Sequence, residues 1–168
     1  MKVNEVMRTP VITVREDATL EAVIEIMLNH RILGLPVTNG FGDLVGIITE
    51  SDFVIREANS SRFHFQTPRI FNRCTGEKEA STLYGVALTS RAQDLMTTPV
   101  VTVTEQDSLE QVIKLMLAYD IGRIPVLRGK IPVGIVTCHD LLELMARRLR
   151  QERAPEQVPE PIVESAHR

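Results

Sequence analysis

Two short segments of the chain place an aspartate three residues after a threonine, where a helix is expected to begin. They are Thr49 with Asp52 and Thr137 with Asp140. A hydroxyl and free backbone N–H groups at a helix start suit a phosphate, and a carboxylate in the first turn can accept two hydrogen bonds from a ribose diol. The same residues also cap helices without any ligand. The pattern alone leaves both interpretations open.

These segments recur because residues 95–146 repeat residues 6–58 in the same order. Thr9-Pro10 returns 89 positions later as Thr98-Pro99, and the offset falls to 88 after Gly40-Phe41-Gly42. Turns accept such length changes, whereas strands and helices do not. A unit of roughly 55 residues is only marginally stable alone, so the two copies are expected to share one core.

Each copy passes through the same order of hydrophobic patterns. A β-branched stretch (11–14, 100–103) precedes an amphipathic helix (20–29, 109–119), two strands joined by a Gly-containing turn (35–38 with 44–49, 124–127 with 132–137), and a second helix that begins near Asp52 or Asp140. Thr19 and Ser108 are predicted to cap the first helices, Ser108 in a capping box with Gln111. The predicted fold is α/β, with two tandem β-α-β-β-α units.

The predicted boundaries are 3–58 for the first repeat and 91–148 for the second. The insert at 59–90 is too apolar for a solvated linker, so part of it is expected to pack or to touch a partner. The Pro- and Glu-rich tail at 149–168 is predicted to be disordered.

Composition excludes several functions. A net charge of -3 provides no overall field for nucleic acid, and apolar runs shorter than about 18 residues predict no membrane span. The N-terminus lacks the pattern of a secretion signal, so a cytoplasmic location is expected. Cys138 and His139 beside Asp140 could suggest a metal site or nucleophile, but no further cluster with ligand spacing supports either. No metal site and no enzyme are therefore predicted.

The repeated motifs resemble a known family. Each copy carries Pro-Val near the first strand, Leu/Ile-Pro-Val after the first helix, and Gly-Ile-Ile/Val-Thr-x-x-Asp at the end of the hairpin. This order resembles the CBS-domain family, named after cystathionine β-synthase, in the tandem form called a Bateman module. The resemblance implies a pseudo-twofold pair with two clefts between the copies. In many members these clefts bind AMP, ADP, ATP or S-adenosylmethionine as a regulatory signal, and no other cofactor is implied.

Transferring the family's site by position predicts two clefts, each with a base wall from one copy and ribose and phosphate contacts from the other. The main cleft comprises Ile12, Ile32 and Leu33 around the base, with Arg123, Ile135, Thr137, His139 and Asp140 opposite. The second comprises Val101, Ile121 and Gly122, with Gly34, Ile47, Thr49, Ser51 and Asp52 opposite. Arg123 stands where nucleotide-binding members often place a phosphate-contacting arginine, and Gly34 replaces it in the second cleft. Phosphorylated ligands are expected to prefer the main cleft.

The resulting hypothesis is a regulatory sensor of an adenine nucleotide or S-adenosylmethionine. With no catalytic domain expected, its output would be a change of shape or contact with another, unidentified protein. The apolar helix stripes predict a homodimer, and neither nucleic acid nor membrane is an expected partner. The alternative is a dimerisation or interaction scaffold that binds no ligand, which Gly34 and the apolar insert favour.

Overall fold

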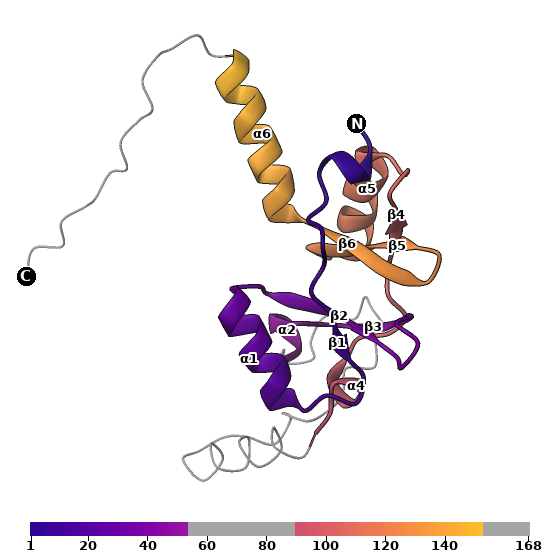
Figure 1. The fold of residues 1–168 in the computed structure, drawn as a ribbon. Coiled ribbons are helices and arrows are strands. Elements are labelled where there is room, and N and C mark those ends of the chain that lie inside the picture. The colour runs from indigo at the N-terminus through magenta and orange to yellow at the C-terminus, as the bar shows by residue number, and fades with distance from the viewer. Residues whose placement is uncertain (54–89, 153–168) are drawn as a thin grey trace, which may run out of the picture.

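The computed structural model describes residues 1–53 and 90–152, which form two similar halves. Each half has a three-stranded sheet, and the predicted α/β fold with two tandem units is confirmed (Figure 1). The expectations for residues 59–89 of the insert and for the tail beyond residue 152 lie outside the described residues. No helix of the described chain is long and apolar enough to cross a membrane.

The first half is built from three strands, one long helix and the start of a second helix. In chain order they are β1 (Val14–Arg15), α1 (Leu20–His30), β2 (Gly34–Thr38), β3 (Leu44–Thr49) and the start of α2 (Glu50–Phe53). The sheet order is β1-β2-β3. β1 runs parallel to β2, and β2 pairs with β3 as an antiparallel hairpin.

The second half repeats this arrangement. Its elements are β4 (Val103–Thr104), α5 (Leu109–Tyr119), β5 (Arg123–Arg128), β6 (Ile131–Thr137) and α6 (Cys138–Glu152). β4 is parallel and β6 antiparallel to the central β5. The predicted boundary at residue 148 falls inside α6, so residues 149–152 continue a helix rather than begin a disordered tail.

The first helices begin and pack as their sequences predict. The Thr19 hydroxyl accepts a hydrogen bond from Ala22 N at 3.3 Å, and the Ser108 hydroxyl accepts one from Gln111 N at 3.1 Å. These bonds satisfy backbone donors that a helix start leaves unpaired. One stripe of each helix is buried against its own sheet: Leu20, Val23 and Met27 on α1, and Val112 and Met116 on α5.

The first segment of each repeat packs in the other half. The short helix η1 (Val3–Glu5) places Val3 in the core of the second half, and Val3 N donates to Asp107 O at 3.0 Å. The helix α4 (Ala92–Leu95) places Leu95 in the core of the first half. Figure 1 shows η1 beside α5 and α4 below the first sheet. Each fully buried apolar side chain contributes roughly 1.5–3 kcal/mol, so neither core is complete without the other copy's leading segment.

Most residues of the two predicted first strands lie outside the sheets, in extended segments that connect the two halves. Only Val14 and Val103 of the two β-branched stretches belong to a strand. The residues before them bridge to the opposite half, where Arg8 pairs with Ile135 and Thr97 with Ile47 in antiparallel fashion. β-branched residues favour extended backbone but do not specify which strand they join.

Two glycines allow these crossings to come close. A Cβ atom at Gly134 would lie 2.7 Å from Met7 Sδ and 3.1 Å from the Arg8 carbonyl oxygen. At the equivalent Gly46, a Cβ would lie 2.6 Å from Met96 Cγ. The two repeats are therefore joined by matched methionine–glycine contacts, one on each side of the pseudo-twofold axis.

Candidate functional site

The two oxygens of the Asp140 carboxylate accept hydrogen bonds from different parts of the chain. Its Oδ2 accepts hydrogen bonds from Thr137 N at 2.7 Å and from the Thr137 hydroxyl at 2.6 Å. Asp140 N in turn reaches the Thr137 hydroxyl at 3.3 Å. This reciprocal pair has the form of a capping box. The helix-capping interpretation is thus correct for Oδ2, and Oδ1 is directed elsewhere.

Asp140 Oδ1 is held by an arginine from the first half. Arg8 Nε donates to it at 2.5 Å, while Arg8 Nη2 lies 3.4 Å from Glu143 Oε1. The Asp140 side chain is only 4% exposed, whereas that of Arg8 is 54% exposed. The hydrogen bond and charge of Asp140 raise the pKa of Arg8 further above its ordinary value. A buried carboxylate therefore has a counter-ion that reaches it from solvent.

The Asp52 carboxylate has the same division with a neutral partner. Its Oδ2 accepts from Thr49 N at 2.6 Å and from the Thr49 hydroxyl at 3.0 Å. Its Oδ1 accepts from the Thr97 hydroxyl at 3.1 Å. Burial raises the pKa of Asp52, although the hydrogen bonds from Thr49 and Thr97 lower it, and nearby Glu50 raises it slightly further. Ser51 joins this group through a 2.7 Å contact between its hydroxyl and that of Thr49.

Arg123 lies at the boundary between the two predicted clefts. It opens β5, where it pairs with Thr137 of the main cleft. Its guanidinium, however, reaches across to the first half, where Nη2 donates to Glu50 Oε1 at 2.8 Å. A Cβ at Gly34 would lie 2.9 Å from Arg123 Cδ. Gly34 therefore makes room for the arginine of the other copy, which explains why only one of the two equivalent positions carries a long side chain.

The side chains of the predicted apolar walls differ in their exposure to solvent. Ile12 and Ile32 pack against the first core, and Val101 and Ile121 pack against the second. Leu33 is 58% exposed, and its carbonyl accepts from Glu50 N at 3.1 Å. Leu33 thus adjoins the residue that binds Arg123, where the two halves meet.

The remaining predicted residues line the helix starts. Ile47 and Ile135 carry the cross-bridges to Thr97 and Arg8. His139 Nε2 lies 3.1 Å from Glu143 Oε1, and Gly122 adjoins Cys138, whose N donates to Gly122 O at 2.9 Å. The structure therefore unites the residues at the start of α6, and those at the start of α2, into two equivalent groups. No cluster of three potential metal-ligating side chains occurs in the described part of the chain.

Sequence reasoning missed three polar residues of these groups. Arg8, Thr97 and Glu50 contact Asp140, Asp52 and Arg123 respectively. A usable signal existed for the first two, because Thr97 follows Arg8 by 89 positions and both precede the repeated Thr-Pro pair. Their partners could not be identified without knowing that these segments cross to the other half.

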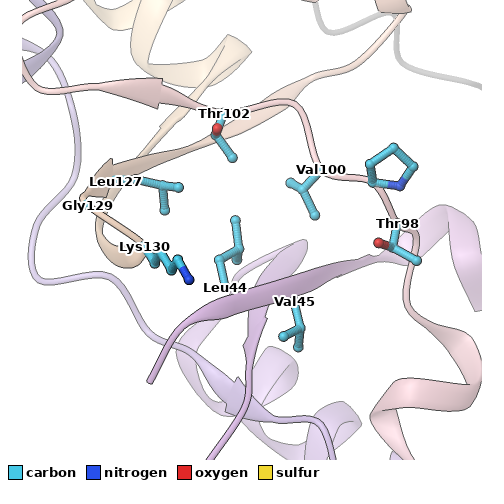
Figure 2. A pocket seen from close by; sticks show the side chains of 9 residues that line it. Leu44, Val45, Thr98, Val100, Thr102, Leu127, Gly129 and Lys130 are labelled. Carbon is cyan, nitrogen blue, oxygen red and sulfur yellow. The ribbon is translucent and has the colours of Figure 1, made fainter. Parts of the chain in front are cut away.

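A hollow of about 300 Å³ is lined by neither Asp52 nor Asp140. It is lined by Leu44, Val45, Thr98, Pro99, Val100, Thr102, Leu127, Gly129 and Lys130. Figure 2 shows Leu44, Val100 and Thr102 directed into the same space. None of its lining residues was predicted as a site residue. Val100 and Thr102 flank Val101 in an extended segment, so they face the opposite side from that predicted wall residue.

Comparison with known proteins places the chain in a family. The family model of the CBS domain matches residues 3–58 and 92–147. MJ1426 of Methanocaldococcus jannaschii is 31% identical over 155 residues, which cover 86% of this chain and 91% of that protein. Several other curated relatives are longer, and the chain spans 62% of MK0525 from Methanopyrus kandleri.

Solved structures agree with this assignment. The CBS domain of a CBS domain containing membrane protein from Sphaerobacter thermophilus is 39% identical, with a TM-score of 0.66 over 86% of this chain and 87% of that one. The CBS domain pair of protein MJ0100 is 25% identical, with a TM-score of 0.63 over 86% of this chain and 99% of that one. Both repeats match the family model, and the alignment with MJ1426 covers most of both chains. This chain therefore belongs to the CBS domain family.

Proposed function

We propose that the chain is a regulatory module that binds an adenosine-containing ligand in clefts at Asp140 and Asp52. The observation that carries the proposal is the divided use of each carboxylate. Oδ2 caps a helix, while Oδ1 faces a segment from the opposite half. A ribose diol that donates to Oδ1 would exchange an internal partner for a ligand and would touch both halves at once.

A related module supports this class of ligand. The solved structure of the CBS domain pair of protein MJ0100 is a complex with 5'-methylthioadenosine and S-adenosyl-L-methionine. Both compounds carry adenine and a ribose diol, so they share the features that a helix-start carboxylate and an apolar base wall would recognise. A nucleotide adds a phosphate, for which Arg123 and the backbone N–H groups at the start of α6 are suitable partners.

The ligand would act as a signal rather than as a cofactor, and the module would not be an enzyme. Each half completes the core of the other through η1 and α4. A ligand that spans the halves would therefore favour one of their relative positions, by the difference in its affinity for the two states. The output would be this change, transmitted to another protein in the cytoplasm, where adenine nucleotides are abundant.

Calorimetric titration tests the proposal directly. Purified protein would be titrated with AMP, ADP, ATP and S-adenosylmethionine, with thermal melting as a second measurement. We expect at least one of these compounds to release or absorb heat with saturation and to raise the melting temperature. Absence of heat and of a melting shift with all four would contradict the proposal.

The alternative function, a ligand-free dimerisation scaffold, is favoured by one feature of α6. Leu142, Met145 and Leu149 lie at helical spacing on this helix and are 64%, 59% and 56% exposed. Figure 1 shows α6 extending away from both sheets. A self-complementary contact between two copies would cover this stripe, and twofold pairs are the commonest oligomers.

Light scattering at micromolar concentration tests whether the chain forms the dimer that this alternative requires. We expect about twice the chain mass, falling towards one chain mass when Met145 and Leu149 are replaced together by glutamate. A monomeric wild type, with or without nucleotide, would contradict the dimer. The scaffold function as a whole requires that Asp52→Ala and Asp140→Ala leave the module's effect on its partner intact.

A further inference from the structure

Arg8 and Thr97 occupy the same position in the two repeats, and each faces the free oxygen of a helix-start aspartate. The contacts are Arg8 Nε to Asp140 Oδ1 at 2.5 Å and the Thr97 hydroxyl to Asp52 Oδ1 at 3.1 Å. The backbone crossings that bring them there are also equivalent, since Arg8 bridges Ile135 and Thr97 bridges Ile47. One cleft thus has a permanent cation where the other has a neutral hydroxyl.

The Arg8 guanidinium is held firmly at only one point. Its Nε bond to Asp140 is short, but Nη2 is 3.4 Å from Glu143 Oε1, and more than half of the side chain is exposed. Glu143 has other partners, with His139 Nε2 at 3.1 Å and Arg147 Nη2 at 3.5 Å. Release of Arg8 would therefore not leave Glu143 without a cation.

We propose that Arg8 makes the Asp140 cleft selective for anionic ligands over neutral ones of the same shape. This inference rests on the proposed function. A ribose diol must displace or share the Arg8 bond to Asp140 Oδ1, which costs a charge-assisted interaction. A neutral nucleoside offers the displaced guanidinium nothing in return, whereas a 5'-phosphate offers it a new anion. The phosphorylated ligand therefore makes two favourable interactions that a nucleoside lacks, one with the Arg8 guanidinium and one with the backbone N–H groups at the helix start.

The Asp52 cleft lacks this exchange. A diol that displaces the Thr97 hydroxyl releases a neutral donor that water can satisfy, so nucleoside and nucleotide lose the same interaction. This cleft also shows that a helix-start aspartate opposite a threonine is compatible with the fold. Arg8→Thr therefore places at Asp140 an arrangement that the chain already contains at Asp52.

The test compares AMP with adenosine, which differ only in the phosphate. Titrations would use Asp52→Ala protein, so that the measured affinity is that of the Asp140 cleft alone. Charge-assisted hydrogen bonds correspond to about one to two decades of affinity. We expect Arg8→Thr to lower the preference for AMP over adenosine by about tenfold or more, and adenosine itself to bind no more weakly. Arg8→Lys should retain part of the preference.

The reciprocal substitution supplies an independent arm. In Asp140→Ala protein, Thr97→Arg should increase the preference for AMP over adenosine at the Asp52 cleft. If Arg8→Thr protein fails to fold, this second measurement tests the inference by itself. An unchanged ratio of AMP to adenosine affinity in folded Arg8→Thr protein, or in Thr97→Arg protein, overturns the inference while leaving the proposed function intact. If the wild type binds neither compound nor any other adenosine ligand, the proposed function fails and the inference with it.

Discussion

The two predicted clefts share a backbone plan and differ in the side chains that meet across it. Both begin with a threonine–aspartate cap, and both direct the second carboxylate oxygen to a segment from the opposite half. At Asp140 that segment supplies Arg8, and at Asp52 it supplies Thr97. Arg123, by contrast, belongs by sequence to the Asp140 side but donates to Glu50, beside Asp52.

This difference distinguishes the residues that the fold requires from the residues that a ligand would contact. The shared features are buried or backbone-bonded: the leading helices η1 and α4, the crossing bridges, and the glycines under Met7 and Met96. The features that differ are charged groups whose side chains can change without removing a core contact. A repeated scaffold can therefore present two unequal binding sites while keeping one pattern of packing.

The largest expected effect tests the exchange of leading segments between halves. Leu95 is fully buried in the core of the first half, although it belongs to the second repeat in sequence. We expect Leu95→Ala to lower the free energy of unfolding by about 2–5 kcal/mol. Hydrogen exchange should show the loss of protection first in β2 and α1. Loss confined to β5 and α5 would contradict the exchanged packing.

A smaller loss is expected where the crossings pass over glycine. Gly134→Ala would place a methyl group 3.1 Å from the Arg8 carbonyl oxygen and closer still to Met7. Overpacking of this kind costs about 1–3 kcal/mol, measurable by urea unfolding. Gly40→Ala is the matched control, because its nearest neighbour would be Arg15 Nη2 at 4.0 Å. Equal stability of the two variants would show that the crossing is not tightly packed.

Arg123 tests whether the clefts are unequal towards phosphate. We expect Arg123→Ala to weaken AMP binding by about tenfold to a hundredfold and adenosine binding much less, since a guanidinium bond to phosphate is lost. Arg128→Ala is the control, because Arg128 is paired with Glu105 and is 72% exposed. If Arg123→Ala left AMP affinity unchanged while Asp52→Ala abolished it, the Asp52 cleft would be the dominant one.

The smallest expected effect is a pH dependence confined to Asp52. Its pKa is raised above the usual 3.8 by burial. A carboxyl with a higher pKa in the folded state binds more protons there, so its contribution to stability falls as pH rises through that window. The stability of wild type minus that of Asp52→Asn should therefore decrease from pH 4 upwards and then level off, as followed by urea unfolding. A difference that rises with pH would reverse the assigned sign.

The sequence was informative wherever a pattern was local. Ser108 caps its helix by accepting from Gln111 N, although no reciprocal bond from the Gln111 side chain completes the predicted capping box. The repeated Thr-x-x-Asp marks both helix starts. Sequence could not show that Val3 and Leu95 pack in opposite halves, because one apolar turn fits either core equally well. It could not show the direction of Arg123 either, since that depends on the Glu50 carboxylate and on the space above Gly34.

The central claim is that adenosine-containing ligands bind through the two helix-start carboxylates. The most direct measurement is a calorimetric titration of AMP into wild type and into the double variant Asp52→Ala/Asp140→Ala, with folding of both checked by circular dichroism. We predict saturable heat with the wild type and none with the folded double variant. Binding of equal affinity and stoichiometry to both proteins would contradict the account and direct attention to another surface.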